Sequence, residues 1–327
     1  MELPGPHPME HLKRMLDSIL EVIPPGSQIV YMDYPVHENI GDLLIMKGTE
    51  KFFHDHRIRV RKRLSFLQFR SRMRIPSDWI IVCHGGGNFG DLYTDNQKLR
   101  ETLVATYPTH RIVVLPQTVF FSDAGERERS LGRFANHPDF HLFVRDLTSY
   151  ETVRGNLANV YLCPDMAHRL YPIQAPPNRS AKVLGLFRTD GEAGHHEAGE
   201  CDCDTRTDWP QLLSGWDFLL LRLMVKGFVL DRYLMNLLPL RPVWYRMADR
   251  FVAKAVRLYG SFGSVVTSRL HGHILACLMD LPNRLIDNNY GKNSSYYRQW
   301  THRIQQEGMP SESSAGNDRG GLYAESS

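Results

Sequence analysis

Short runs of apolar and β-branched residues alternate with longer segments of helical periodicity along most of this chain. The apolar runs predict buried strands at residues 28–32, 79–84, 111–115, 141–144 and 160–163. The segments between them predict helices, of which 41–54 and 95–106 are the clearest. Apolar strands that alternate with helices are typical of a parallel sheet covered on both faces. We therefore predict an α/β fold built on parallel sheets.

A second series of strands follows a proline-rich, polar segment at 173–179, which has the composition of a linker. These strands are predicted at 182–187, 262–267 and 283–286. A chain of 327 residues is long enough for two domains that each bury a core. We expect an N-terminal Rossmann-like domain at 1–175 and a C-terminal one at 176–305, with a cleft between them. Residues 306–327 have few apolar side chains and are predicted to be a disordered tail.

Composition and charge exclude some classes of protein. Lys and Arg total 39 and Asp and Glu 36, so the net charge of +3 is too small to indicate a nucleic-acid partner. The five cysteines are odd in number, and we expect them to be thiols in a reducing compartment. The first residues lack the basic start and apolar run of a signal peptide, so we expect a cytoplasmic protein.

Residues 218–250 are unusually apolar, but Arg222, Lys226, Asp231 and Arg232 interrupt the run, so it is not predicted to span a membrane. The pattern is amphipathic, and it has two interpretations. The first is a helix packed on its own domain. The second is peripheral contact with an anionic membrane surface, at the inner face of the plasma membrane.

Arg269 and His271 lie between the predicted strand at 262–267 and an apolar helix predicted at 274–281. The carboxyl end of a parallel strand is where α/β proteins bind ligands. An arginine offers paired donors to a phosphate or carboxylate, and a histidine exchanges protons near neutral pH. The pair predicts an active site for an anionic substrate, with a buried ion pair and a core histidine as the alternative.

Three consecutive glycines, Gly85, Gly86 and Gly87, come directly after the second predicted strand. Without side chains at these positions, backbone N–H groups can face an anion or a sugar ring closely. The spacing matches neither a dinucleotide-binding fingerprint nor a Walker loop. With His84 and Asn88, the glycines predict a ligand-binding turn that leads into a helix.

Polar residues occupy the same position after the other strands. Asn39 and Asp42 follow the first strand, where they either cap the next helix or line the cleft. The corresponding residues after later strands are Gln117, Arg145, Asp165 and Arg188.

Six motifs, in this order, carry a resemblance to a known family. They are NIGD at 39–42, HGGGNFGD at 84–91, VRD at 144–146 with SYE at 149–151, CPD at 163–165, SRLHG at 268–272 and DNNYGK at 287–292. Together they resemble the polysaccharide pyruvyl transferase family over roughly residues 30–300. The resemblance implies two Rossmann-like domains that face a cleft, as in GT-B glycosyltransferases. It also implies phosphoenolpyruvate as the donor substrate, no separate cofactor, and a saccharide of an exopolysaccharide or cell-surface polysaccharide, carried on a lipid, as acceptor.

The resemblance also implies roles for particular residues. Arg269, Leu270 and His271 match the donor segment of the family, and Arg145 matches a donor-binding arginine of the first domain, with Arg188 as its competitor. The last motif adds substrate-binding candidates at Asp287, Tyr290 and Lys292.

We expect His271 to act as general acid or base while a pyruvate ketal forms on two sugar hydroxyls. Asp165, Asp42 and Asp91 are the carboxylates that are candidates to assist it. No metal is chemically required. Two alternatives stay open, a GT-B-type glycosyltransferase with a nucleotide-sugar donor and a non-catalytic saccharide-binding assembly partner.

Overall fold

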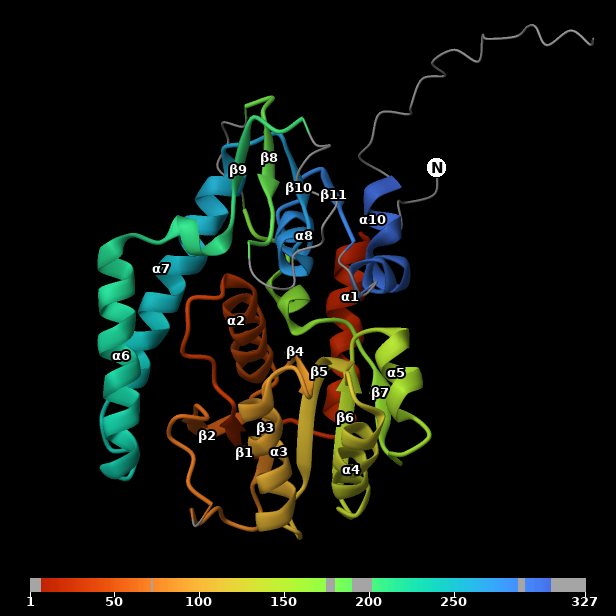
Figure 1. Cartoon of the computed structure of the whole chain (residues 1–327), viewed down its shortest axis with the longest axis vertical. Helices are drawn as coiled ribbons and strands as arrows, with labels where there is room; N and C mark the ends of the chain where they lie inside the picture. The colour runs from red at the N-terminus through yellow and green to blue at the C-terminus, as the bar shows by residue number, and fades with distance from the viewer. Residues whose placement is uncertain (1–6, 72, 175–179, 190–201, 288–291, 307–327) are drawn as a thin grey trace, which may run out of the picture.

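The computed structural model describes residues 7–71, 73–174, 180–189, 202–287 and 292–306 (Figure 1). Two parallel sheets form its centre and lie one above the other in that view, with helices around both. This confirms the predicted α/β class with parallel sheets. The predicted domain boundary falls at residues 175–179, which lie outside the described residues, as does nearly all of the predicted tail.

The first sheet has seven strands. They are β1 (Gln28–Met32), β2 (Arg59–Leu64), β3 (Ile80–Cys83), β4 (Gly86–Gly90), β5 (Ile112–Phe120), β6 (Phe140–Val144) and β7 (Val160–Leu162). The strands pair in the order β2-β1-β3-β5-β6-β7, and β4 pairs with the second half of β5. The sequence does not predict β2, because its side chains are mostly basic and the strand lies at the edge of the sheet.

The second sheet has four strands in the order β11-β10-β8-β9. They are β8 (Val183–Leu186), β9 (Thr205–Thr207), β10 (Ser264–Thr267) and β11 (Asn283–Leu285). The predicted strands of the second series all appear, and β9 is an additional, short and polar edge strand.

The helices surround the two sheets. The α-helices are α1 (Pro8–Met15), α2 (Ile40–Asp55), α3 (Thr94–Thr106), α4 (Ala124–Ala135), α5 (Leu147–Val153), α6 (Gly215–Tyr233), α7 (Leu240–Gly260), α8 (Leu270–Leu278), α9 (Lys292–Tyr296) and α10 (His302–Gln306). The other helical segments are η1 (Leu16–Glu21), η2 (Met166–Leu170), η3 (Trp209–Leu212) and the π-helical η4 (Tyr297–Thr301).

The glycine segment forms strand β4, which corrects the predicted turn into a helix. The cause lies in β5, which continues through Pro116 instead of ending before it. Proline has no N–H to donate, and the register between β5 and β6 shifts between Val114 and Gln117. β3 pairs with the part of β5 before the proline, and β4 pairs with the part after it.

Apolar packing continues from one sheet to the other. One cluster of buried residues extends from α1 through α2 to α7 and α8, and it includes Ile29 of the first sheet and Leu184 of the second. A second cluster covers the opposite face of the first sheet. The two sheets are therefore held against a common set of helices.

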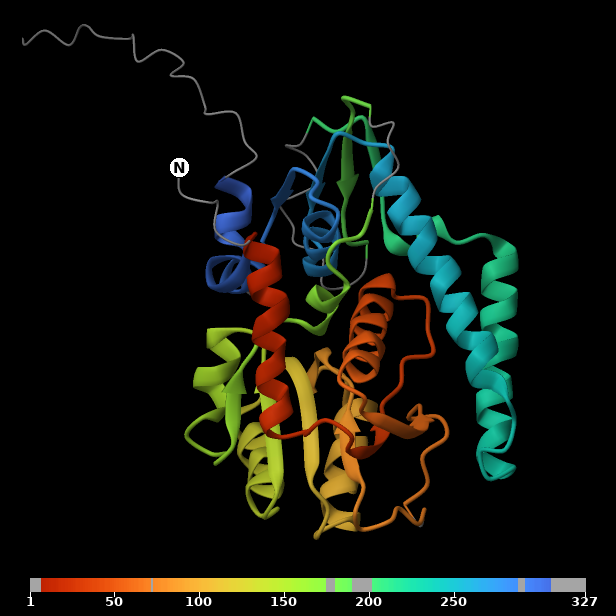
Figure 2. The same ribbon diagram turned by 180° about the vertical axis from the view of Figure 1, so that it is seen from behind.

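The apolar residues 218–250 lie mostly in two helices, α6 and α7. These helices run alongside each other at one side of the molecule (Figures 1 and 2). The Trp244 indole of α7 donates a hydrogen bond of 2.9 Å to the Pro35 carbonyl. None of the described helices is both long enough and apolar enough to cross a membrane.

The cysteines differ in part from the prediction. Cys83, Cys163 and Cys277 are buried free thiols, and burial raises the pKa of each to about 12. Cys203 is disulfide-bonded, so the prediction of five thiols is wrong at that position.

Three buried histidines should make folding sensitive to acid. Burial lowers the pKa of His84 to about 3 and the pKa values of His168 and His273 to about 4. The unfolded value is about 6.5, so the unfolded chain binds more protons, and stability is lost as pH falls from about 6.5 toward 4. We expect the free energy of unfolding to fall by up to about 1.4 kcal/mol per pH unit for each histidine.

Urea unfolding measured between neutral pH and about pH 4.5 tests this expectation. A His273→Gln variant should show a shallower dependence on pH than the wild type. A free energy of unfolding that stays constant over this range would contradict the prediction.

Candidate active site

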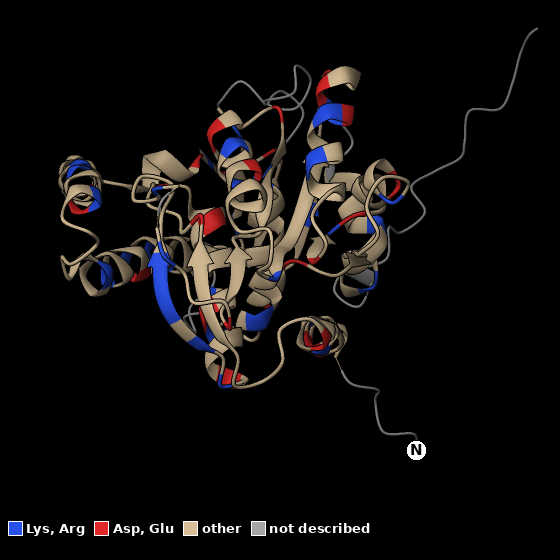
Figure 3. Cartoon of the chain, turned by 90° about the horizontal axis from the view of Figure 1, so that it is seen from below, with Lys and Arg blue, Asp and Glu red and all other residues tan. Residues whose placement is uncertain are grey.

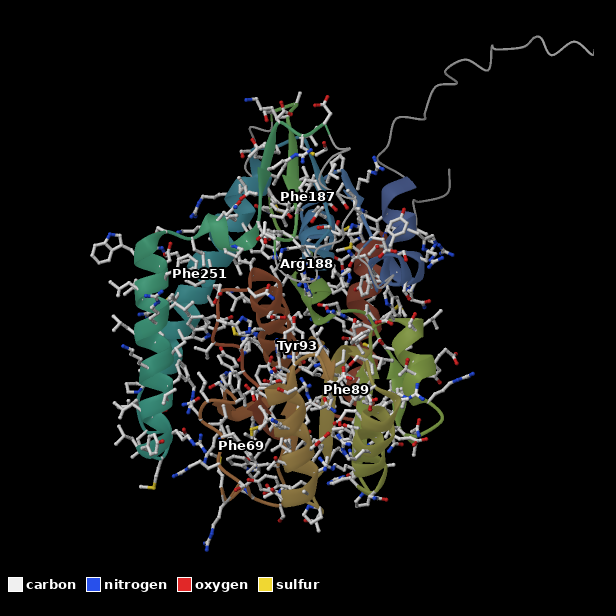
Figure 4. The ribbon with its side chains drawn as sticks, in the orientation of Figure 1. Phe69, Phe89, Tyr93, Phe187, Arg188 and Phe251 are labelled. Atoms are coloured by element: carbon white, nitrogen blue, oxygen red, sulfur yellow. The ribbon has the colours of Figure 1, made fainter. Side chains whose placement is uncertain are left out.

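A cavity of about 380 Å³ lies at the carboxyl ends of strands from both sheets. Residues that follow β1, β3 and β6 form one wall, and residues that follow β8, β9 and β10 form the other. Figure 4 labels a residue of each wall, Tyr93 on the side of the first sheet and Arg188 on the side of the second. The position is the one at which α/β proteins bind ligands, and the volume suits a small molecule.

The structure brings most of the predicted site residues to this cavity. Those that line it are Asn39, Asp42, His84, Gly87, Asn88, Arg145, Arg188, Arg269, Leu270 and His271. Four others, Gly85, Gly86, Gln117 and Asp165, lie directly behind the lining residues.

The last motif is not brought into the cavity in the same way. Asp287 is absent from the described lining, and its carboxylate accepts a hydrogen bond of 3.3 Å from the Ser294 backbone. Lys292 begins α9, and Tyr290 lies outside the described residues.

Arg145, Asp165 and His271 form one connected group. Arg145 Nη1 donates to Asp165 Oδ2 at 2.6 Å, and His271 Nε2 lies 3.3 Å from the same oxygen. The His271 nitrogen is also 3.5 Å from Arg145 Nη1. The helix α8 begins at Leu270, earlier than predicted, so His271 lies in its first turn and not in the preceding loop.

Asp165 is the charged centre of this group. Burial alone would raise the pKa of this carboxyl, but His271, Arg145 and the Ala167 N–H together hold it well below its usual range. The carboxylate is therefore ionised at neutral pH and contacts both the Arg145 guanidinium and the His271 imidazole. Of the three carboxylates that the sequence leaves as candidates, Asp165 contacts His271, whereas Asp42 accepts from Asn39 and Asp91 from Ser122.

Gly41, the second residue of α2, lies against the imidazole of His271. A β-carbon at Gly41 would be 2.8 Å from His271 Nδ1 and 2.9 Å from Cγ. These distances are shorter than side chains tolerate, so the missing side chain lets α2 approach the histidine. Gly41 and Asp165 thus hold the imidazole from two sides.

Arg269 is held by a second buried carboxylate, Asp208. Arg269 Nη2 donates to Asp208 Oδ2 at 2.6 Å, and its Nε donates to the other oxygen. Burial favours the neutral acid, but Arg269 and the Trp209 N–H outweigh it, so the pKa of Asp208 is lowered. Sequence reasoning missed Asp208 because it follows β9, an edge strand that the hydrophobic pattern does not show.

Asp33 and Arg100 were also missed. They form a buried ion pair of 2.9 Å, and Arg100 Nη1 donates to the Asn88 carbonyl at 2.9 Å. Burial raises the pKa of Asp33 despite this pairing. Asp33 directly follows β1, so the rule that identified Arg145 could have found it, whereas Arg100 lies within α3 and has no such signal.

His84 lies at the cavity wall, and one of its ring nitrogens is buried. Its Nδ1 lies 2.5 Å from the Tyr31 hydroxyl, and its Nε2 has no hydrogen-bond partner within the described ranges. Burial raises the pKa of Tyr31 well above 10, so the phenol keeps its proton and can donate it to Nδ1. Because His84 is neutral above about pH 3, that arrangement leaves its own proton on Nε2.

Three arginines and three acidic residues, Asp33, Glu38 and Asp42, line the cavity, so guanidinium donors and not a net positive charge are what it offers to an anion. The arginines are Arg145, Arg188 and Arg269. A β-carbon at Gly87 would lie 3.2 Å from Arg145 Nη2, so the glycine leaves this nitrogen accessible. Across the part of the chain that is described, no group of three or more His, Cys, Asp or Glu side chains is arranged to hold a metal ion.

Comparisons with known proteins indicate the family of this chain. Residues 39–290 match the sequence model of the family described as polysaccharide pyruvyl transferase. EpsO of Bacillus subtilis (strain 168), provisionally named a pyruvyl transferase, is 41% identical over 307 residues, which cover 93% of this chain and 94% of EpsO. Pyruvyl transferase 1 of Schizosaccharomyces pombe is 31% identical over 86% of this chain and 72% of that protein.

A solved structure supports the fold. A functionally uncharacterized protein of Klebsiella pneumoniae superposes with a TM-score of 0.60, covering 88% of this chain and 94% of that chain at 20% identity. The family match extends from the helix that contacts His271 to the motif that follows β11, and it includes Arg145, Asp165 and Arg269. The chain therefore belongs to the polysaccharide pyruvyl transferase family and is a transferase.

Proposed function

We propose that this protein transfers the pyruvyl group of phosphoenolpyruvate to a saccharide of an exopolysaccharide or cell-surface polysaccharide, as a cyclic ketal. The observation that supports the proposal most is the connected group of Arg145, Asp165 and His271 in a cavity lined by two further arginines. In this proposal the sheets belong to two Rossmann-like domains, 1–175 and 176–305, in a GT-B-like arrangement around the cavity.

The donor would be held by the arginines. Phosphoenolpyruvate carries a carboxylate and a phosphate, and guanidinium groups bind both through paired, charge-assisted hydrogen bonds. Arg145 offers Nη2 beside Gly87, and Arg269 faces it from the other wall of the cavity. The donor substrate carries the reactive group, so the proposal includes no separate cofactor.

His271 would carry the protons. His271 gives a proton to the methylene carbon of the donor, which becomes the methyl group, and a sugar hydroxyl adds to the neighbouring carbon and returns its own proton to His271. Phosphate leaves, the second hydroxyl adds to the same carbon, and the proton released goes to phosphate. Asp165 would stabilise the imidazolium form of His271.

The acceptor would be a repeat unit still attached to its lipid carrier. We propose that the protein meets it in the cytoplasm, at the inner face of the plasma membrane. The polysaccharide in the family description supports a saccharide acceptor, and the identity of the sugar is left to the experiment.

Phosphate release tests the donor and the reaction class. The purified protein is incubated with phosphoenolpyruvate and a panel of saccharides, and we expect phosphate release that requires both. An Arg269→Ala variant should lose saturation by phosphoenolpyruvate, whereas Arg154→Ala, which removes an exposed ion pair on α5, should not. Turnover of a nucleotide sugar without any turnover of phosphoenolpyruvate would indicate a glycosyltransferase instead.

Replacement of Gly41 by alanine should slow turnover without unfolding the protein. The new methyl group would displace the imidazole of His271 from its present position, and displacements of this size cost about 10- to 100-fold in rate. The matched control is Gly132→Ala in α4, where a β-carbon meets nothing within 4 Å. Equal turnover of the two variants, measured by phosphate release, would refute the positioning role of Gly41.

A further inference from the structure

Large apolar side chains are exposed along α6 and the turn that follows it. Of the fifteen large apolar residues that are exposed in the described ranges, eleven lie between residues 216 and 243. Trp216 is 73% exposed, Tyr233 75% and Leu237 76%. α6 is the outermost helix on its side of the molecule, with α7 between it and the sheets (Figures 1 and 2). A patch of this kind on a surface marks an interaction site.

The exposed residues share one face of α6. Leu219, Leu223, Leu230 and Tyr233 follow the helical spacing of three, four and seven residues, and all are exposed. The opposite face, with Leu221 and Phe228, is buried. α6 is thus apolar on both its inner and its outer sides, and only the inner side has a partner within the described chain.

The acidic and basic residues of this segment differ in exposure. Its acidic residues, Asp217 and Asp231, are each 1% exposed and point inward. Asp217 pairs with Lys254 of α7, and Asp231 accepts hydrogen bonds from Gln68 at 2.6 Å and the Leu238 N–H at 2.7 Å.

The basic residues of the same segment remain outside. Arg222, Lys226 and Arg232 are exposed on α6, and no acidic residue occurs between Asp217 and Asp231 in the sequence. In Figure 3, where the molecule is seen from below, the two helices lie at the left edge and carry several blue segments. The outer face therefore combines apolar side chains with positive charge.

We propose that the outer face of α6 docks on the surface of an anionic lipid bilayer. A helix with apolar side chains beside Lys and Arg lies in the plane of the headgroups, where anionic lipids attract its cations. Trp216 and Tyr233, near the two ends of α6, have the amphipathic rings that favour this interface. A second copy on the same face would place Arg222 and Lys226 close to their own counterparts, and like charges oppose such a contact.

Docking would place the cavity close to the bilayer. α7 joins α6 to the cavity wall, because Trp244 is hydrogen-bonded to Pro35, which lines the cavity. Lys47 of α2 also pairs with Asp249 of α7. Docking would help catalysis only if the acceptor is carried on a lipid, so this consequence rests on the proposed function. The docking itself does not depend on that function.

Vesicle flotation tests the proposal with the full chain. We expect binding to vesicles of phosphatidylcholine with phosphatidylglycerol, weaker binding at high salt, and at least about 10-fold weaker binding to phosphatidylcholine alone. The combined variant Trp216→Ser, Leu223→Ser and Leu230→Ser should bind the anionic vesicles at least about 10-fold less tightly. The matched control, Leu92→Ser with Leu147→Ser, changes exposed leucines elsewhere and should bind as the wild type does.

Other results would overturn the proposal. Absence of binding by the wild type, or equal loss in the matched control, would do so. A concentration-dependent dimer without lipid, abolished by the triple variant in sedimentation equilibrium, would assign the face to a second copy. Phosphate release with a soluble saccharide should be the same in the triple variant as in the wild type, so failure of docking and failure of the proposed function are separate results.

Discussion

Replacement of His271 by alanine is expected to lower kcat by about 100- to 10,000-fold, the usual contribution of a general acid or base. Binding of phosphoenolpyruvate should largely remain, because Arg145 and Arg269 are held by their own carboxylates and not by the histidine. Phosphate release gives kcat, and calorimetric titration of the donor gives its affinity. The matched control is His54→Ala, because the His54 side chain is exposed on α2.

The two measurements separate two roles of His271. A fall in kcat with unchanged donor affinity assigns it to proton transfer. A loss of donor affinity with unchanged kcat would make it a binding residue and would contradict the mechanism proposed above.

Replacement of Asp165 by asparagine is expected to destabilise the fold by about 3–5 kcal/mol and to lower kcat. The new side chain has nearly the same shape, but the buried Arg145 guanidinium loses its counter-charge and His271 loses its acceptor. Urea unfolding measures the first effect and phosphate release the second. In contrast, Glu151→Gln, at an exposed ion pair with Arg154, should cost no more than about 1 kcal/mol.

A second variant keeps this prediction testable if Asp165→Asn does not fold. Combining it with Arg145→Gln leaves neither charge unpaired, so the double variant should recover part of the lost stability. If the double variant is less stable than Asp165→Asn alone, the pairing of the two charges is not what stabilises this part of the fold.

The hydrophobic pattern predicted the central strands and the edge strands β7 and β11, but it missed the polar edge strands β2 and β9 and the glycine-rich β4. β1, β3 and β6 are buried on both faces, so their residues are apolar in sequence and easily recognised. β2 and β9 pair on one side only and are basic or polar, and β4 contains three glycines. Such segments become strands because a neighbouring strand offers hydrogen bonds, which is a property of the sheet and not of their own residues.

The residues of the candidate site were also predicted only in part. The residues that follow β1, β3, β6, β8 and β10 were found because the ends of parallel strands meet at one edge. Asp208 escaped because its strand was not recognised, and Arg100 because it lies within a helix. Among the three candidate carboxylates, the choice of Asp165 required the three-dimensional contact with His271.

The sequence by itself determined the α/β class, the family and most of the polar residues at the strand ends, because periodicity and short motifs are properties of consecutive residues. The tertiary structure alone decided which of these residues act together. Asp165 meets His271 across 106 positions of the chain, and Asp208 meets Arg269 across 61. It also decided that both acidic residues of α6 point inward while Leu219, Leu223 and Leu230 remain outside. Which residues contact one another, and how buried each side chain is, depend on segments that only folding brings together. A local sequence pattern does not contain this information.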